Sequence, residues 1–190
     1  MDKLYIVYGI KKKSSIKKWK KFAETLSDFQ VNKKISYGTK IGQYKIISDK
    51  ELLKLIESHD IKTKNANLLL LGSYNENYII KKINPDLPVK FNGKYIEVLK
   101  ERYKNPGLIL TCPNPLNKKN LIGIITFPFN DDYAINYARN LNLNLRMYNS
   151  IMDITGYIVP DIIIFKSYSK IAALGYFNYN WQELNITKIK

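Results

Sequence analysis

Short apolar runs, separated by turn-forming residues, are the dominant pattern along the chain. The first run, "LYIVY", is rich in β-branched and aromatic residues and is closed by Gly9, which is typical of a buried strand. Similar runs recur at regular intervals and predict further strands. The predicted strands are residues 4–8, 44–48, 67–72, 121–127 and 161–165, with a last strand or a tight turn at 170–177.

Segments with apolar residues every three or four positions lie between these runs and predict amphipathic helices. The first follows Ser14 and Ser15, which are suitable caps, and places Lys17, Lys18 and Lys20 on its solvent side. The predicted helices are residues 16–29, a segment from Ser48 or Asp49 to Ser58, residues 75–83 and residues 131–143.

Strands that alternate with helices, several of them apolar on both faces, indicate a parallel sheet covered on both sides. Residues 88–112 differ, because short, partly alternating pieces are separated there by Asn92-Gly93 and Asn105-Pro106-Gly107, the punctuation of antiparallel strands. We therefore predict a single α/β domain over residues 1–190. Its expected fold is a Rossmann-like or flavodoxin-like three-layer domain, with a mainly parallel sheet and a small antiparallel extension at one edge.

A set of motifs in a fixed order resembles a known family. The motifs are "LYIVYG", "NANLLLLGSYNEN", "GLILTCPNPLNKKNLIGIITF", "VPDIIIF" and "IAALGYFNYNW". Together they resemble the α/β accessory domain that follows the hydrolase domain in large prolyl-oligopeptidase-like peptidases and esterases. The chain departs from that pattern at Pro128 and Phe129, where the family tends to have small residues and glycine.

The resemblance implies a non-catalytic accessory or protein-interaction module. In such proteins the catalytic residues belong to the hydrolase domain, which this chain lacks. The implied partner is a hydrolase or a surface assembly.

The residues themselves offer little for catalysis. The nearest approach to a nucleophile elbow, Gly72-Ser73-Tyr74-Asn75-Glu76, ends in glutamate instead of glycine, and the one histidine, His59, falls at the end of a predicted helix. The one cysteine, Cys112, excludes an internal disulfide and, with a single histidine, a Cys/His zinc cage. We expect no catalytic residue, no metal and no cofactor.

Acidic and lysine residues also suggest a metal-dependent nuclease, but the spacing is unsuitable. Asp86, Glu97 and Lys100 occur together, as do Asp161 and Lys166. Glu97 and Lys100 are three positions apart, so on a strand their side chains would point to opposite faces. They could not meet at one metal ion.

The position of a ligand site follows from the expected topology. In open α/β sheets, ligands bind beyond the carboxyl ends of the strands where the strand order reverses. The loops after the strands at 4–8 and 67–72 should lie side by side there and offer serines, lysines and a helix N-terminus to an anion or a phosphoryl group. The candidate ligand-binding residues are Gly9, Lys11, Lys12, Ser14, Ser15, Gly72, Ser73, Asn75 and Asn77. The alternative is a pair of capped turns with solvated lysines, and no GxGxxG or Walker sequence names a nucleotide.

The net charge of +15 adds anionic molecules to the possible partners. A positive field attracts nucleic acid, an anionic membrane or an acidic protein without specifying which. Lysines that only solvate the surface are the alternative, so nucleic-acid binding is possible but not favoured. No signal peptide or transmembrane segment is recognisable, and we expect a cytoplasmic protein by default.

Two further segments attract attention. The aromatic residues near the C-terminus either dock the tail onto the domain or form a protein interface; they are Tyr176, Phe177, Tyr179 and Trp181. The loop "PNPLN" reads as a stiff crossover into the strand at 121–127, in which Asn114 and Asn117 bond back to the turn.

Overall fold

The computed structural model describes residues 3–32, 44–58, 65–127, 160–167 and 170–189, and it combines a large sheet with a small one. The strands are β1 (Lys3–Tyr8), β2 (Tyr44–Ser48), β3 (Ala66–Leu71), β4 (Val89–Asn92), β5 (Tyr95–Val98), β6 (Glu101–Lys104), β7 (Gly107–Asn114), β8 (Asn117–Thr126), β9 (Ile162–Ser167), β10 (Lys170–Phe177) and β11 (Leu184–Lys188). The helices are α1 (Ile16–Asn32), α2 (Asp49–Glu57) and α4 (Tyr78–Ile83), with short 3-10 turns η1 (Lys13–Ser15) and η2 (Asn84–Asp86).

The eight-stranded sheet changes from parallel to antiparallel pairing half-way across. Its order is β11-β10-β9-β7-β8-β3-β1-β2, and the pairs within β2, β1, β3 and β8 are parallel. From β8 onward through β7, β9, β10 and β11 every pair is antiparallel. Strands β4, β5 and β6 form a separate antiparallel sheet.

The predicted fold class was therefore wrong. The sheet is mixed instead of mainly parallel, and the described ranges contain only three α-helices, too few to form the two outer layers of a Rossmann-like or flavodoxin-like domain. The segment 88–112 is also not an edge extension. Its first part forms the separate small sheet, and its last part belongs to β7, which lies in the interior of the large sheet.

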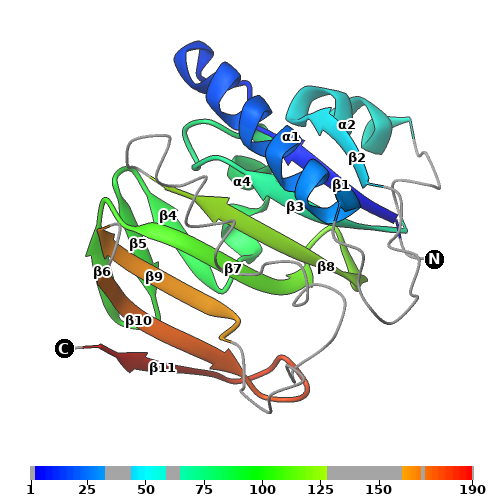
Figure 1. Cartoon of the computed structure of the whole chain (residues 1–190). Helices are drawn as coiled ribbons and strands as arrows, with labels where there is room; N and C mark the ends of the chain where they lie inside the picture. The colour runs from blue at the N-terminus through cyan, green and yellow to red at the C-terminus, as the bar shows by residue number, and fades with distance from the viewer. Residues whose placement is uncertain (1–2, 33–43, 59–64, 128–159, 168–169, 190) are drawn as a thin grey trace.

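The error has a physical cause in how the two faces of the large sheet are covered. Along β7, Leu108 and Leu110 belong to one apolar cluster and Ile109 to the other, so both faces are buried. Helix α1 packs on one face, whereas α2, α4 and the small sheet pack on the opposite face (Figure 1). An apolar run shows that both faces of a strand are covered, but it does not show the strand's direction or whether a helix or a sheet covers it.

The first helix has the predicted amphipathic arrangement. Its buried residues are Trp19, Phe22, Ala23 and Leu26. Lys17, Lys20 and Lys21 are exposed, as the spacing predicts for the solvent side. The helix is preceded by the 3-10 turn η1, in which Ser15 is buried and its hydroxyl donates a hydrogen bond to the Lys12 carbonyl (3.0 Å).

The loop "PNPLN" is a hairpin turn, so the predicted crossover was wrong. Strands β7 and β8 are antiparallel neighbours joined by Pro115 and Leu116. The carboxamide oxygen of Asn114 accepts a hydrogen bond from the Leu116 N–H (3.0 Å), and that of Asn117 accepts one from the Lys119 N–H (3.2 Å). Asn114 thus bonds to the turn as predicted, whereas Asn117 bonds within the start of β8 and not to the turn.

Two further differences concern the second half of the chain. The predicted helix at 131–143 lies outside the described residues, and β11 had no counterpart among the predicted elements. Among the described segments, none of the helices is both long and apolar enough to cross a membrane.

Candidate functional site

The loops after β1 and β3 lie side by side, as the sequence predicts. The two strands are parallel neighbours, and the order β3-β1-β2 makes this the point where the chain crosses from one side of β1 to the other. The Gly9 N–H donates to the Leu71 carbonyl (3.0 Å) and the Lys11 N–H donates to the Glu76 carbonyl (3.0 Å). Gly9 is required for this approach, because a Cβ atom there would collide with the Glu76 carbonyl group.

Several of the candidate ligand-binding residues are used to hold these loops. Asn77 is buried; its carboxamide oxygen accepts from the N–H groups of Ile79 and Ile80, and its nitrogen donates to the Leu71 carbonyl (3.1 Å). The Lys11 ammonium group donates to the Tyr74 carbonyl (3.4 Å). These side chains stabilise the two loops, and Gly9 and Gly72 let the loops pack closely.

A buried carboxylate that the sequence analysis did not single out fixes the same loops. One oxygen of Asp49 accepts from the Ile10 N–H (3.3 Å) and the other from the Tyr78 N–H (2.7 Å). Asp49 is fully buried, and burial raises the pKa of its carboxyl above the usual value against those hydrogen bonds. The sequence placed it only at the start of a helix, because its partners are distant along the chain.

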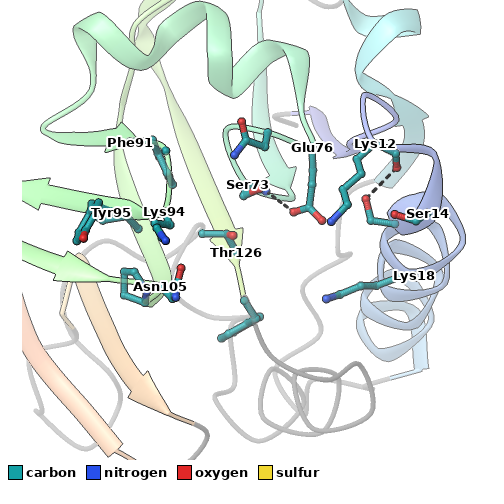
Figure 2. A pocket seen from close by; sticks show the side chains of 16 residues that line it. Lys12, Ser14, Lys18, Ser73, Glu76, Phe91, Lys94, Tyr95, Asn105 and Thr126 are labelled. Atoms are coloured by element: carbon teal, nitrogen blue, oxygen red, sulfur yellow. Dashed lines mark hydrogen bonds between the residues drawn. The ribbon is translucent and has the colours of Figure 1, made fainter.

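A cavity of about 440 Å³ opens next to these loops (Figure 2). Part of its lining comes from the predicted set, namely Lys12, Ser14, Ser15, Ser73 and Asn75. The remainder comes from the loop between β3 and α4, α1, the end of β8, the hairpin of β4 and β5, and the turn before β7. The sequence analysis missed this remainder, which includes Lys18, Glu76, Phe91, Lys94, Tyr95, Asn105 and Thr126.

The change of strand direction helps to form the cavity. Because β3 and β8 are parallel, their carboxyl ends lie at one edge of the sheet. Because β7 runs the other way, its beginning, preceded by Asn105 and Pro106, lies at that same edge. The small sheet closes the cavity on one side, so the lining combines residues of the large sheet and of the small sheet.

Glu76 occupies the position where the sequence predicts an anion. The Ser73 N–H donates to its carboxylate (2.9 Å). Burial opposes ionisation of this carboxyl, but hydrogen bonds outweigh it and lower the pKa of Glu76. We attribute most of the effect to Ser73, because the indole nitrogen of Trp19 has no hydrogen bond of normal geometry and the Ser15 hydroxyl donates to the Lys12 carbonyl.

Because Glu76 already accepts a hydrogen bond from the Ser73 N–H of the loop, lysine side chains supply the positive charge of the lining. Lys12 and Lys18 reach the cavity from η1 and α1, and Lys94 reaches it from the turn between β4 and β5. Lys18 also lies over the Trp19 ring, with 4.9 Å between its ammonium nitrogen and the ring centroid. With these lysines and one glutamate the lining carries a formal charge of 3 − 1 = +2.

No metal site accompanies this cavity in the described part of the chain. Nowhere within the described ranges do three histidine, cysteine, aspartate or glutamate side chains gather closely enough to hold a metal ion. Of the acidic residues weighed for a nuclease, Glu97 pairs with Arg102 (3.3 Å) and Asp161 accepts from the Phe177 N–H (2.9 Å). His59 lies outside the described residues.

The C-terminal aromatic residues lie elsewhere, beside a second cavity of about 740 Å³. Phe177 and Trp181 line it and contact each other, with 5.3 Å between ring centroids, while Tyr176 is half-buried on β10. Tyr179 is 88% exposed.

Cys112 also borders this second cavity, but burial and the charge of Asp161 raise the pKa of its thiol to about 12, so the reactive thiolate is scarcely formed at neutral pH.

Comparison with known proteins identifies no relative of this chain. No protein-family model, no curated protein and no solved structure matches the chain. The resemblance to a peptidase-associated accessory domain therefore stays a prediction, and the function is argued from the site.

Proposed function

We propose that the protein binds a small ligand with a phosphoryl or similar anionic group in the cavity between α1 and the small sheet. The observation that carries this proposal is the convergence of Lys12, Lys18 and Lys94, from two separate parts of the fold, on one cavity at the carboxyl edge of β3 and β8. Solvated surface lysines would not be expected to gather from separate elements around one hollow.

The lining suits an anion that carries more than one charge. Lysine is a common phosphate ligand, and the hydroxyl group of Ser14 is a further donor at the same wall. Glu76 repels an incoming anion, because its lowered pKa keeps it ionised at neutral pH. The net charge of the lining therefore favours a ligand with at least two negative charges, such as a phosphate ester.

Binding can be tested with the Lys12→Met variant, which removes one cation and keeps an unbranched side chain. Isothermal titration calorimetry at low salt, with pyrophosphate as the probe, should show binding to the wild-type chain and roughly tenfold weaker binding to the variant, about 1.4 kcal/mol. Lys100→Met is the matched control, because Lys100 is exposed in the turn between β5 and β6, outside the cavity lining. Absence of binding to the wild type, or an equal loss in the control, would contradict the proposal.

Protein interaction is the second candidate function, as the resemblance to an accessory domain implies. It is favoured by Tyr179, a large aromatic side chain that is 88% exposed beside the Phe177 and Trp181 pair. Aromatic residues placed in this way are typical of interface anchors. A photoreactive phenylalanine at position 179 should cross-link a hydrolase or other partner, while the same group at position 100 should not. A partner captured equally from both positions would argue against a specific interface.

Nucleic-acid binding is a third candidate, favoured by the exposed lysines of α1, which include Lys17, Lys20 and Lys21. Lysine–phosphate contacts release counterions, so such binding must weaken steeply between about 50 and 200 mM salt. A fluorescence titration with an oligonucleotide whose affinity does not change with salt would eliminate this candidate.

A further inference from the structure

The cavity has two chemically different ends. Figure 2 shows Lys12 extending toward Glu76 and Lys18 extending from α1 into the cavity, while Phe91, Tyr95, Lys94 and Asn105 lie on the opposite side, around the hairpin of the small sheet. The first end gathers charges, and the second combines aromatic side chains with a neutral carboxamide and one lysine.

The size of the cavity exceeds what a free anion needs. About 440 Å³ falls in the range of sites that hold whole small molecules, roughly 300–1,000 Å³. Inorganic phosphate would fill a small part of it and would leave the half-buried ring of Tyr95 in contact with water, whereas Phe91 and Phe127 beside it are already buried. A ligand that covers the exposed part of Tyr95 removes apolar surface from water, which favours binding.

Apart from Lys94, the polar groups at this end of the cavity suit hydroxyl groups better than a second anion. The Asn105 carboxamide has both donors and an acceptor, and the Thr126 hydroxyl has one donor and acceptor lone pairs. Sugar hydroxyl groups also both donate and accept, and sugar or base rings pack on aromatic side chains such as Tyr95. The ring of Tyr95 is itself held by Arg102, whose guanidinium carbon lies 3.9 Å from the ring centroid.

We infer that the ligand of this cavity is a phosphate ester of a sugar, either a simple sugar phosphate or a nucleoside monophosphate, an inference that rests on the proposed function. The phosphoryl group lies at the end formed by Lys12 and Lys18. The sugar lies toward Asn105 and Thr126, where the small sheet discriminates the ester from free phosphate.

The decisive experiment compares inorganic phosphate, ribose 5-phosphate and adenosine monophosphate on the wild-type chain by isothermal titration calorimetry at low salt. We expect ribose 5-phosphate to bind at least tenfold more tightly than phosphate. A further tenfold gain for the nucleotide would identify a nucleoside ligand, and equal affinity of the two esters would identify a sugar phosphate. Phosphate that binds as tightly as both esters would overturn the inference and leave the proposed function standing, whereas absence of all binding would overturn both.

Two variants separate the ends of the cavity. Lys12→Met should weaken all three probes by a similar factor. Asn105→Gly keeps the backbone, because Asn105 has φ of 47° and glycine adopts that conformation readily, and it should weaken only the esters, by about five- to tenfold. Asn185→Gly, an exposed position on β11, is the control and should change none of the affinities. An Asn105→Gly variant that loses phosphate and ester binding equally would contradict the assigned orientation, and the wild-type comparison decides the ligand class even if a variant misfolds.

Discussion

Asp49 and Asn77 each join segments that are far apart in the chain, and in both cases the side chain satisfies backbone groups at the end of a strand or the start of a helix. Asp49 accepts hydrogen bonds from Ile10 and Tyr78, and Asn77 donates to the Leu71 carbonyl while capping α4. Because all these groups are buried or half-buried, loss of either side chain leaves them without a partner in a place that water reaches poorly.

We expect Asp49→Ala to lower the free energy of unfolding by about 2–6 kcal/mol, since it leaves two N–H groups unpaired at roughly 1–3 kcal/mol each. Urea denaturation followed by circular dichroism would measure the change. Asp86→Ala is the comparison, because Asp86 is exposed and the effect there should stay within about 0.5 kcal/mol. Equal losses in the two variants would mean that the Asp49 hydrogen bonds contribute little.

The hydrogen bonds of Glu76 predict a specific dependence of stability on pH. Its folded-state pKa is lowered, so its ionised form stabilises the folded state above the unfolded pKa of 4.5, and this contribution is lost as the pH falls through the folded pKa. The wild-type chain should therefore exceed Glu76→Gln in unfolding free energy by a constant amount near neutral pH, and the difference should shrink below about pH 4.5. Thermal unfolding of both chains from pH 3 to pH 7 would show this, and a difference that grows as the pH falls would contradict it.

At the residue level, the sequence analysis found part of the site for a clear reason. Gly9 and Gly72 follow two apolar runs, and parallel strands place such loops together, so Lys12 and Ser73 could be predicted at one edge of the sheet. The sequence analysis could not separate residues that line the cavity from residues whose side chains stabilise the loops. Asn77 is used by the fold because its partners lie at the ends of β1 and β3, and Lys94 reaches the cavity because the small sheet folds back. Both depend on distances between segments, which local patterns do not contain.

Helix α2 shows how short signals define an element. Its N-cap, Ser48, accepts a hydrogen bond from the Glu51 N–H (3.3 Å), and the Glu51 carboxylate accepts one from the Ser48 N–H (2.7 Å), which together make a capping box. The sequence predicted this helix start because all of the interacting groups lie within four residues. The same locality explains why β1, β2 and β3 were predicted nearly to the residue.

We expect Ser48→Ala to lower the free energy of unfolding by about 1 kcal/mol, within the usual range of about 0.5–2 for loss of a cap. Ser58→Ala at the other end of the helix is the control. The Ser58 hydroxyl donates to the Leu55 carbonyl (3.1 Å) in an exposed position, so that change should be within about 0.5 kcal/mol. Chemical denaturation of the three proteins would distinguish the outcomes, and a larger loss in Ser58→Ala would show that the cap is not the main determinant.

For the whole molecule, we expect apolar packing between the two sheets to stabilise their contact more than the ion pair between them. Leu108 and Leu110 of the large sheet share one buried cluster with Ile96 and Val98 of the small sheet. The Lys188–Glu101 pair (2.8 Å) also connects β11 with β6, but the side chains are 61% and 43% exposed, so water screens the pair. The burial of Ile96 and Val98 was predictable from the alternation along β5, but their packing partner was not, because a helix could cover the same apolar face.

Two substitutions test this balance. Leu110→Ala should lower the unfolding free energy by about 2–5 kcal/mol, because Leu110 is fully buried and the shortened side chain leaves a cavity. Glu101→Gln should change it by less than about 1 kcal/mol, as is usual for an exposed ion pair. Calorimetric unfolding measures both. A larger effect of Glu101→Gln would show that charge pairing, and not packing, holds the sheets together.

The reversal of strand direction at β8 also has a consequence for the order of folding. Strands β7 and β8 meet through the short turn at Pro115 and Leu116, whereas the β3 residue Leu68 pairs with Ile122 across a long intervening chain. Short-range pairings lose less chain entropy on forming, so we expect the hairpin to be structured in the transition state and β3 to join it later. Stopped-flow kinetics of Leu110→Ala should then give a φ-value above about 0.5, and Leu70→Ala on β3 one below about 0.3. In that order of events the 440 Å³ cavity is among the last parts of the molecule to form, because its walls come from both sides of the late β3–β8 junction.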